Sequence, residues 1–362
     1  MADKKDAIVG CLLGTAVGDA FGLPFEMLSR QRQLKVYPKL EGHHFFFGRG
    51  MFSDDTQHAY MVAQAIIASN GDITVFTKRL AREFRWWLVT MPAGIGKATL
   101  LSISKLWLGV SPHRSGIFSA GNGPSMKSAI IGVCYGDDRL KMCELVRTAT
   151  VITHTDPKAF FGALTVAVAA HMASRGQHIQ PQEFLDRVKE TLNGWAPNGQ
   201  KSSEEVAAFL GLMQHVVQSV TAGHDTLQFA DDLGLSKGVS GYTYHTVPVV
   251  IHSWLRHQRD YKSAVVDVVR CGGDTDTTGA IVGAITGAGV GKAGLPQKWL
   301  EDVWDWPVTM KWIERLGIQL DEVCSTGVVL RPLEVSVLGS LLRNIAFVFI
   351  VFGHLLRRLL PF

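Results

Sequence analysis

The sequence predicts an all-α protein, and two observations lead to this fold class. Apolar residues recur at helical spacing through most of the chain, as Phe76, Leu80 and Phe84 illustrate. Strict alternation of apolar and polar residues, which is typical of a half-buried strand, is scarce. No long linker or low-complexity stretch divides the chain, so we expect one helical domain over residues 5–330 and a hydrophobic C-terminal helix in the tail, residues 331–362.

The composition favours a large buried core and a reducing compartment. Of the 362 residues, 47% are hydrophobic and 19% are charged, which disfavours disorder. The formal net charge is only +4 and no Lys/Arg run occurs, so we expect no nucleic-acid partner. The cysteines are odd in number and form no Cys-x-x-Cys pair, which disfavours a zinc knuckle or a disulfide framework and favours a cytoplasmic location; they are Cys11, Cys134, Cys143, Cys271 and Cys324.

Two stripes of glycine mark the first helix and a late helix. Glycine recurs at every fourth position over residues 10–22 and again over residues 279–291, which places each set along one face of a helix. Because a glycine inside a helix costs about 1 kcal/mol relative to alanine, we expect these two helices to approach each other closely. A small-residue seam between membrane helices is the alternative, but Asp19 interrupts the first stripe and residues 279–291 are too few to span a bilayer.

The first helix and the turn after it hold two acidic candidates. Asp19 lies within an otherwise apolar helical stretch, and a buried carboxylate needs a hydrogen-bond donor or a metal as its partner. Glu26 follows Pro24 and should lie just past the helix. Glu26 is open to three interpretations: a general base, a residue of a metal shell, or an ordinary surface glutamate.

Two clusters of aspartates precede predicted helices. Residues 53–56 read Ser-Asp-Asp-Thr, and residues 272–278 read Gly-Gly-Asp-Thr-Asp-Thr-Thr. Helix capping is the simpler interpretation, since Ser and Asp cap helices and acids in the first turn favour the helix dipole. If the clusters meet in space, however, four carboxylates converge, and like charges that close repel strongly unless a cation lies between them. Carboxylate and hydroxyl oxygens suit Mg²⁺, Mn²⁺ or Ca²⁺, and two such ions would be a natural solution.

Three further loops have residues suited to binding a substrate. Residues 119–127 contain Gly-Asn-Gly before Pro124, a sequence that would expose backbone amides to a phosphate. His154 lies in a loop beside a helix start, and residues 240–246 offer Tyr242 for stacking on a base. A plain glycine-rich turn, a structural histidine and core aromatic packing are the corresponding simpler interpretations.

Taken in order, these motifs resemble those of the ADP-ribosylglycohydrolase family. The series reads Gly-x-x-x-Gly-Asp-Ala, Ser-Asp-Asp-Thr, Gly-Asn-Gly-x-x-Met, Thr-His-x-Asp-Pro, Ser-Gly-Tyr and Gly-Gly-Asp-Thr-Asp-Thr, and it extends over residues 7–316. The family includes the dinitrogen-reductase-activating glycohydrolase and the ADP-ribosylarginine and ADP-ribosylserine hydrolases. The resemblance implies a single orthogonally packed all-α domain with a central binuclear metal cleft.

The resemblance also implies a role for each matching residue. Two divalent cations, Mg²⁺ or Mn²⁺, would be held by Ser53, Asp54, Asp55, Asp274, Asp276 and Thr277. The substrate would contact Ser119, Gly121, Asn122, Gly123, Ser125, Met126, His154, Gly241 and Tyr242. Asp55 and Glu26 are both candidates for proton transfer, and the sequence does not decide between them. Two positions depart from the family pattern, since Lys127 stands where the family often has Arg and Ser53 stands where many members have Thr.

The function that the resemblance implies is metal-dependent hydrolysis of the glycosidic bond at C1″ of ADP-ribose. The partner would be an ADP-ribosylated protein or another ADP-ribose conjugate. The bond would join ADP-ribose to an arginine guanidinium, which we favour, or to a serine. Two alternatives stay open: a catalytically silent binding or structural protein, which metal titration would test, and a metal-dependent hydrolase of another nucleotide or glycoside, which product analysis would test.

The tail is long and apolar enough for several roles. As a helix, residues 335–356 would cross a bilayer core of about 30 Å, but Arg343 near the middle would cost about 2.5–3.5 kcal/mol on insertion scales. Three interpretations are open: a membrane anchor, an interfacial helix held by Arg343, Arg357 and Arg358, and a helix packed on the protein or on a second subunit. The first two predict membrane contact through residues 333–360.

Overall fold

The computed structural model describes residues 3–45, 47–193 and 200–359, and within these residues the regular structure is helical, with isolated β-bridges but no sheet. The α-helices are α1 Lys4–Gly22, α2 Arg30–Val36, α3 Asp54–Ser69, α4 Ile73–Val89, α5 Lys97–Trp107, α6 Ala129–Tyr135, α7 Arg139–Val151, α8 Pro157–Ser174, α9 Pro181–Asn193, α10 Gln200–Thr221, α11 Thr226–Asp232, α12 Thr243–Arg256, α13 Tyr261–Arg270, α14 Thr275–Val290, α15 Gln297–Asp302, α16 Met310–Thr326 and α17 Val337–Leu359. Three short 3₁₀ helices are η1 Leu23–Phe25, η2 Ser125–Lys127 and η3 Lys292–Gly294. The all-α prediction is confirmed.

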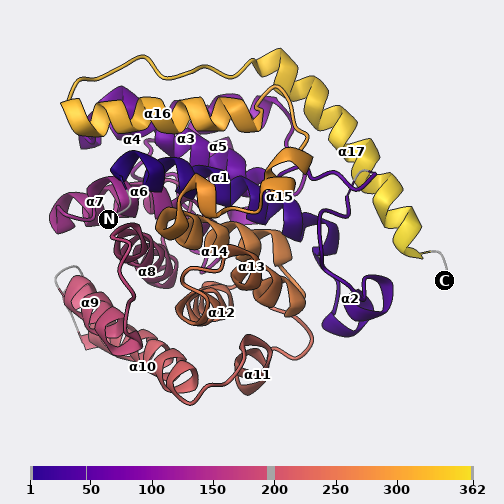
Figure 1. Ribbon diagram of the computed structural model, residues 1–362. Coiled ribbons are helices and arrows are strands. Elements are labelled where there is room, and N and C mark those ends of the chain that lie inside the picture. Colours follow the sequence, from indigo (N-terminus) through magenta and orange to yellow (C-terminus); the bar gives the residue numbers. More distant parts are fainter. Residues whose placement is uncertain (1–2, 46, 194–199, 360–362) are drawn as a thin grey trace.

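Helices α1 and α14 lie side by side in the centre of the fold (Figure 1), and both are buried over most of their length. Their glycine stripes face each other. A Cβ atom on Gly14 would overlap the backbone carbonyl oxygen of Gly283, and a Cβ atom on Gly18 would overlap that of Gly279. The predicted close approach is therefore confirmed. Residues 4–25 are long and apolar enough to span a membrane, but their most apolar window of 18 residues is completely buried inside the protein, as in a core helix.

We expect Gly14→Ala to destabilise the protein by about 1–3 kcal/mol or more, because the added methyl would push two central backbones apart. Gly211, in the middle of α10, is the matched control, since a Cβ atom there would meet nothing within 4 Å. Gly211→Ala should be neutral or stabilising by up to about 1 kcal/mol, because alanine favours the helix. Urea unfolding measures both variants, and equal effects at the two sites would contradict the close approach.

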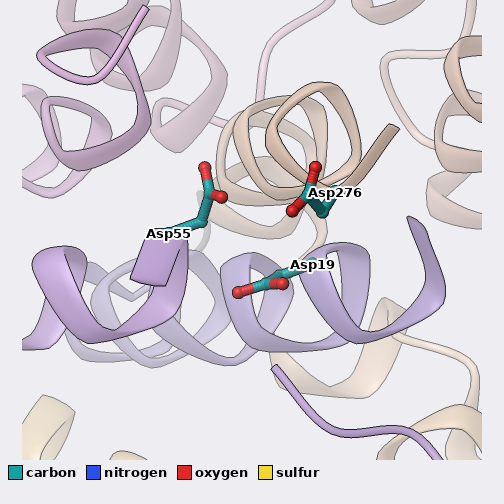
Figure 2. Close-up of side chains that lie close together, drawn as sticks. All are labelled: Asp19, Asp55 and Asp276. Atoms are coloured by element: carbon teal, nitrogen blue, oxygen red, sulfur yellow. The ribbon is translucent and has the colours of Figure 1, made fainter. Parts of the chain in front are cut away.

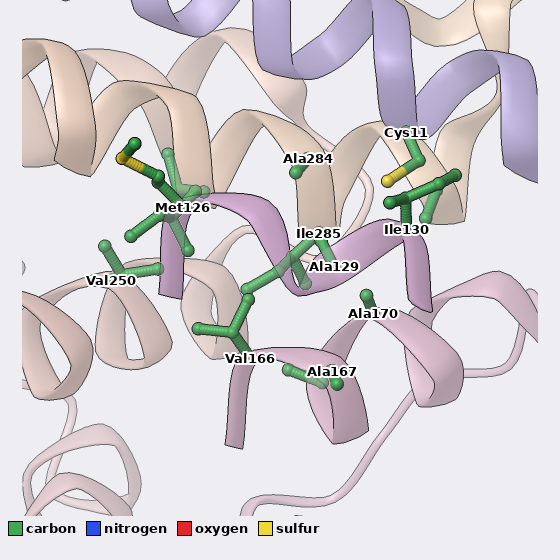
Figure 3. Packing of buried hydrophobic residues seen from close by; sticks show 14 of the residues in the cluster. Cys11, Met126, Ala129, Ile130, Val166, Ala167, Ala170, Val250, Ala284 and Ile285 are labelled. Atoms are coloured by element: carbon green, nitrogen blue, oxygen red, sulfur yellow. The ribbon is translucent and has the colours of Figure 1, made fainter. Parts of the chain in front are cut away.

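Small side chains also allow α6 and α8 to pack closely beneath α14 (Figure 3). Ile130 of α6, Ala167 of α8 and Ile285 of α14 belong to one continuous buried core. At Gly132 a Cβ atom would overlap the carbonyl group of Ala167. Interiors packed this densely respond to volume changes as small as one methylene. The core therefore holds α6, α8 and α14 in fixed positions relative to one another.

Helix α17 packs along the outside of the domain, after an extended segment that follows α16 (Figure 1). The face toward the domain contains Arg343, Asn344, Phe347 and His354, all of them buried. On the opposite face Phe349 is 73% exposed. Of the three interpretations of the tail, the structure shows the helix packed on the protein.

Membrane contact through residues 333–360 stays a prediction. Residues 337–356 have the length and hydropathy of a membrane span, and 22% of that window is buried inside the protein. The side chains of Arg357 and Arg358, which we expected at a membrane interface, lie outside the described residues.

Candidate metal centre

Helix α3 begins at the first aspartate cluster. Ser53 is its N-cap: the hydroxyl oxygen accepts a hydrogen bond from the amide of Asp55 at 3.2 Å and donates one to Oδ2 of Asp55 at 3.0 Å. Asp54 and Asp55 occupy the first turn, where acids favour the helix dipole. The capping interpretation is therefore correct for Ser53. The same cap fixes the Asp55 side chain.

Helix α14 begins at the second cluster, directly after a pair of glycines. Gly272 and Gly273 adopt φ angles of +72° and +86°, which disfavour any residue with a Cβ atom. Here the chain is hydrogen-bonded on two sides, since the amide of Gly273 donates to Leu28 O at 2.9 Å and that of Asp274 donates to Val239 O at 2.7 Å. Because a Cβ atom on Gly273 would overlap the backbone of Val239, the glycine pair is what allows this close fit.

The two clusters meet, as the resemblance to the family implied. The hydroxyl of Thr277 donates to Oδ2 of Asp55 at 3.2 Å and so links the start of α14 to the start of α3. Figure 2 shows Asp55 and Asp276 turned toward the same space, with Asp19 of α1 beside them. Carboxylate oxygens of Asp19, Asp55 and Asp276 lie within 4.8 Å of one another.

Asp19 was not among the predicted site residues, although its burial in an apolar helix had indicated a partner. Its carboxylate accepts hydrogen bonds from the amide of Ser53 at 2.9 Å, the amide of Thr56 at 3.0 Å and the hydroxyl of Thr56 at 2.6 Å. Asp19 thus holds the first turn of α3 against α1. Sequence spacing gives no sign of this contact, because 34 residues separate Asp19 from Ser53.

The carboxylates of the cluster repel one another, and their burial disfavours the charged form of each. Burial, followed by repulsion from neighbouring acids, raises the pKa of Asp54 to about 8 and raises the pKa values of Asp55 and Asp276 well above the usual range. Burial also raises the pKa of Asp19 to about 6. Oδ1 of Asp55 is buried and has no hydrogen-bond partner among the described residues. Divalent cations such as Mg²⁺ bind carboxylate oxygens, and their positive charge offsets the repulsion between buried carboxylates. This cluster therefore suits a divalent cation.

We expect Mg²⁺ to stabilise the protein more at pH 8 than at pH 5.5. The folded-state pKa values of Asp19 and Asp54 lie above the ordinary aspartate value, so the metal-free protein loses stability as the pH rises through about 6 and about 8. A cation that replaces these protons binds up to roughly tenfold more tightly per pH unit for each proton displaced. Thermal melts with and without Mg²⁺ measure this difference, and a Tm shift that is equal at both pH values would contradict it.

The predicted substrate loops surround one cavity of about 690 Å³, a size typical of small-molecule sites. Its lining includes most of the predicted residues: Glu26, Asp54, Asp55, Ser119, Gly121, Asn122, Gly123, Met126, His154, Gly241, Asp274, Asp276 and Thr277. Ser53, Ser125 and Tyr242 do not line it, and Ser53 lines a second, adjoining cavity. Ser125 is fully buried, and the Tyr242 ring packs edge-on against His245. Their predicted substrate contacts stay predictions.

Within the loop over residues 119–126, the amide of Asn122 donates to a backbone carbonyl and the amide of Gly121 donates to the Ser119 hydroxyl oxygen at 3.3 Å. The predicted contact of this loop with a phosphate stays a prediction. The amide of Asn122 donates to Gly241 O at 2.9 Å, and the amides of Ser125 and Met126 both donate to Asn122 O. The Asn122 side-chain nitrogen donates to Oδ2 of Asp274 at 2.7 Å, so this residue orients a candidate metal ligand. The loop therefore connects the acidic cluster to the cavity wall.

His154 lies against this loop as a neutral imidazole. Burial, followed by the charge of Lys127, lowers the pKa of His154 to about 3. Its Nδ1 atom lies 2.9 Å from the Thr153 hydroxyl. A Cβ atom on Gly121 or Gly123 would lie 3.1 Å from the imidazole ring, which is a tight contact, so glycine at both positions leaves room for the ring.

Lys127 is buried beneath the loop and does not line the cavity. Its ammonium group donates to Gly123 O at 3.0 Å, and burial lowers its pKa to about 7. Lys127 therefore shapes the loop from below. At this position, where the family often has Arg, the side chain has a structural contact.

Comparison with known proteins agrees with this geometry. The sequence profile of the ADP-ribosylglycohydrolase family matches residues 1–327. The chain is 29% identical over 320 residues to an uncharacterised protein of Archaeoglobus fulgidus, covering 86% of this chain and 95% of that protein. It is 24% identical over 302 residues to the ADP-ribosyl-[dinitrogen reductase] glycohydrolase of Rhodospirillum rubrum, covering 82% of this chain and 89% of that protein. It is also 24% identical to the ADP-ribosylhydrolase ARH3 of Gallus gallus, covering 80% of this chain and 87% of that protein.

A solved structure described as an ADP-ribosylglycohydrolase-related protein complex shares the fold. The two structures superpose with a TM-score of 0.62 at 22% sequence identity, over 90% of this chain and 100% of the other. The family match over residues 1–327 agrees with the order of the motifs and with the meeting of the two aspartate clusters. This chain therefore belongs to the ADP-ribosylglycohydrolase family, whose members are hydrolases that act on glycosidic linkages of ADP-ribose.

Proposed function

We propose that this protein is a metal-dependent hydrolase that removes ADP-ribose from a modified protein side chain, with arginine favoured and serine as the second linkage. The observation that supports this most directly is the meeting of the two aspartate clusters at one wall of a nucleotide-sized cavity. Oδ1 of Asp55, buried without a partner among the described residues, indicates where a cation would bind.

The residues divide into a metal-holding set and a proton-handling pair. Two divalent cations, Mg²⁺ or Mn²⁺, would be held by Ser53, Asp54, Asp55, Asp274, Asp276 and Thr277. When bound, these cations would supply Lewis acidity to the reacting sugar and to water. Asp55 or Glu26, which both line the cavity, would accept the proton that water releases.

In the overall reaction, water adds to C1″ and the bond from C1″ to the side-chain nitrogen or oxygen breaks. The leaving atom takes up a proton, so the products are ADP-ribose and the unmodified side chain. The acidic cluster would stabilise the positive charge that develops on the sugar in an oxocarbenium-like transition state. His154, neutral over the physiological pH range, would contribute a hydrogen bond without adding charge to the cleft.

The decisive assay measures ADP-ribose release from arginine-linked, serine-linked and poly-ADP-ribosylated substrates, each with Mg²⁺, Mn²⁺ or EDTA. Release from one substrate that requires a metal would support the proposal and identify the linkage. If the folded, metal-bound protein releases ADP-ribose from none of them, the proposal is wrong and a silent binding role or another nucleotide substrate takes its place.

A further inference from the structure

A second cavity, of about 240 Å³, lies between α17 and the metal centre. Five residues line both this cavity and the larger one: Glu26, Met27, Asp54, Gly94 and Asp276. The two cavities therefore adjoin at the same carboxylates. A molecule that reacts at these carboxylates has room to extend in both directions.

The walls of the two cavities differ in chemistry. The larger cavity has glycine-rich loops, hydroxyls and the imidazole of His154. The second cavity is acidic where it meets the metal centre and apolar elsewhere, with Leu23 and Phe45 on one side and Phe347, Val351 and Leu355 on the other. Phe45 and Phe347 pack with ring centroids 5.7 Å apart. An extended apolar group with a polar or cationic end matches this pattern.

Helix α17 supplies one wall of the second cavity and is held firmly beside it. Phe347, Val351 and Leu355 recur at four-residue spacing and so share one face of the helix. The Nε2 atom of His354, which is also on α17, lies 3.0 Å from the carbonyl oxygen of Pro24. Pro24 is two residues before Glu26, so this contact joins α17 to the chain beside the metal centre. The family match ends at residue 327, so this wall is built by a segment beyond the matched region.

We propose that the second cavity is the leaving-group subsite, which receives a guanidinoalkyl side chain while ADP-ribose occupies the larger cavity. This inference rests on the proposed function, because the bond that breaks must then lie at the carboxylates, between the two cavities. The alkyl stem would contact Phe347 and Val351, and the guanidinium would face the carboxylate of Glu26. A serine side chain has no alkyl stem to contact these apolar walls.

The test compares two substrates that have the same linkage: ADP-ribosyl-agmatine, which has a butyl stem, and ADP-ribosyl-guanidine, which has none. Val351→Trp fills the second cavity from α17, and Ala93→Trp fills it from the loop on the other side. Val348→Trp is the matched control, because Val348 is 49% exposed on the outer face of the same helix. Binding of free ADP-ribose and the Tm report whether each variant keeps its fold.

We expect both cavity-filling variants to lower kcat/KM for the agmatine conjugate by roughly tenfold or more. Turnover of the guanidine conjugate and affinity for free ADP-ribose should change by less than about twofold. Equal losses on both substrates, or the same loss in Val348→Trp, would overturn the subsite.

A binding measurement separates this inference from the proposed function. Free agmatine should bind the Mg²⁺-loaded wild-type protein saturated with ADP-ribose, and Val351→Trp should abolish that binding. If the wild type hydrolyses neither conjugate but shows this pattern, the second cavity is a binding site for a guanidinoalkyl group and the hydrolase proposal fails. If agmatine does not bind, or binds the variant equally well, the subsite is wrong even when hydrolysis is observed.

Discussion

Asp55→Asn is expected to reduce ADP-ribose release by roughly 10³-fold or more, because it removes a charge from the centre of the metal site. Oδ1 of Asp55 lacks a partner among the described residues, whereas Oδ2 accepts from the hydroxyls of Ser53 and Thr277. Asparagine has the same shape and its oxygen can keep those two hydrogen bonds. The loss should therefore come from charge and not from a disturbed fold.

Stability measurements distinguish these two causes. Burial and the neighbouring acids raise the pKa of Asp55 in the metal-free protein, which means that its charge is unfavourable there. The metal-free Asp55→Asn variant should be as stable as the wild type or more stable, and Mg²⁺ should raise its Tm less. Calorimetric titration should show weaker metal binding.

Asp72→Asn is the matched control for this substitution. Asp72 caps α4 just past the C-terminal end of α3, whereas Asp55 lies in the first turn of that helix. Asparagine caps helices equally well, so neither turnover nor metal affinity should change. If Asp55→Asn retained full turnover, Asp55 would be neither an essential ligand nor the proton acceptor. Glu26 would then be the remaining candidate.

The parts of the fold and site that follow local rules could be predicted from the sequence. Four-residue glycine spacing is a helix-face pattern, and it correctly indicated the close pair α1 and α14. Serine and aspartate before apolar helices are capping signals, and they correctly marked the starts of α3 and α14. Spacing alone did not show that these starts meet; the resemblance of the ordered motifs supplied that expectation.

The parts that depend on contacts between distant segments could not be predicted. Lys127 follows Met126, and nothing in its local sequence indicates that the short 3₁₀ turn η2 buries its charged side chain. The amide of Asn122, which looked available for a phosphate, donates to the carbonyl of Gly241, which only the folded arrangement brings near. The tail gave three interpretations because hydropathy does not reveal which face of a helix has a partner.

Arg343→Ala is expected to destabilise the protein by about 3–5 kcal/mol, since removing one partner of a buried ion pair leaves the other charge uncompensated. The Arg343 and Asp305 side chains are 4% and 2% exposed, and their Nη2 and Oδ2 atoms are 2.5 Å apart. Nη2 of Arg343 also donates to Phe52 O at 2.6 Å. Burial raises the pKa of Asp305, and the Arg343 guanidinium opposes that shift.

Arg331→Ala tests whether the effect comes from burial. Arg331 pairs with Glu334 at 2.7 Å, but these side chains are 83% and 62% exposed. Exposed pairs contribute little, so this variant should unfold at the same urea concentration as the wild type. The double variant Arg343→Met with Asp305→Asn should regain much of the stability lost in Arg343→Ala, because no unpaired charge is left in the interior.

Arg343→Ala should also weaken metal binding, which would link the tail helix to the proposed chemistry. Phe52 directly precedes Ser53, the cap of α3, so the hydrogen bond from Arg343 to Phe52 O restrains the chain that leads into the metal site. We therefore expect Arg343→Ala to bind Mg²⁺ less tightly at a temperature where it is still folded, whereas Arg331→Ala should bind it as the wild type does. A destabilised Arg343→Ala with unchanged Mg²⁺ affinity would show that α17 stabilises the domain without positioning the site.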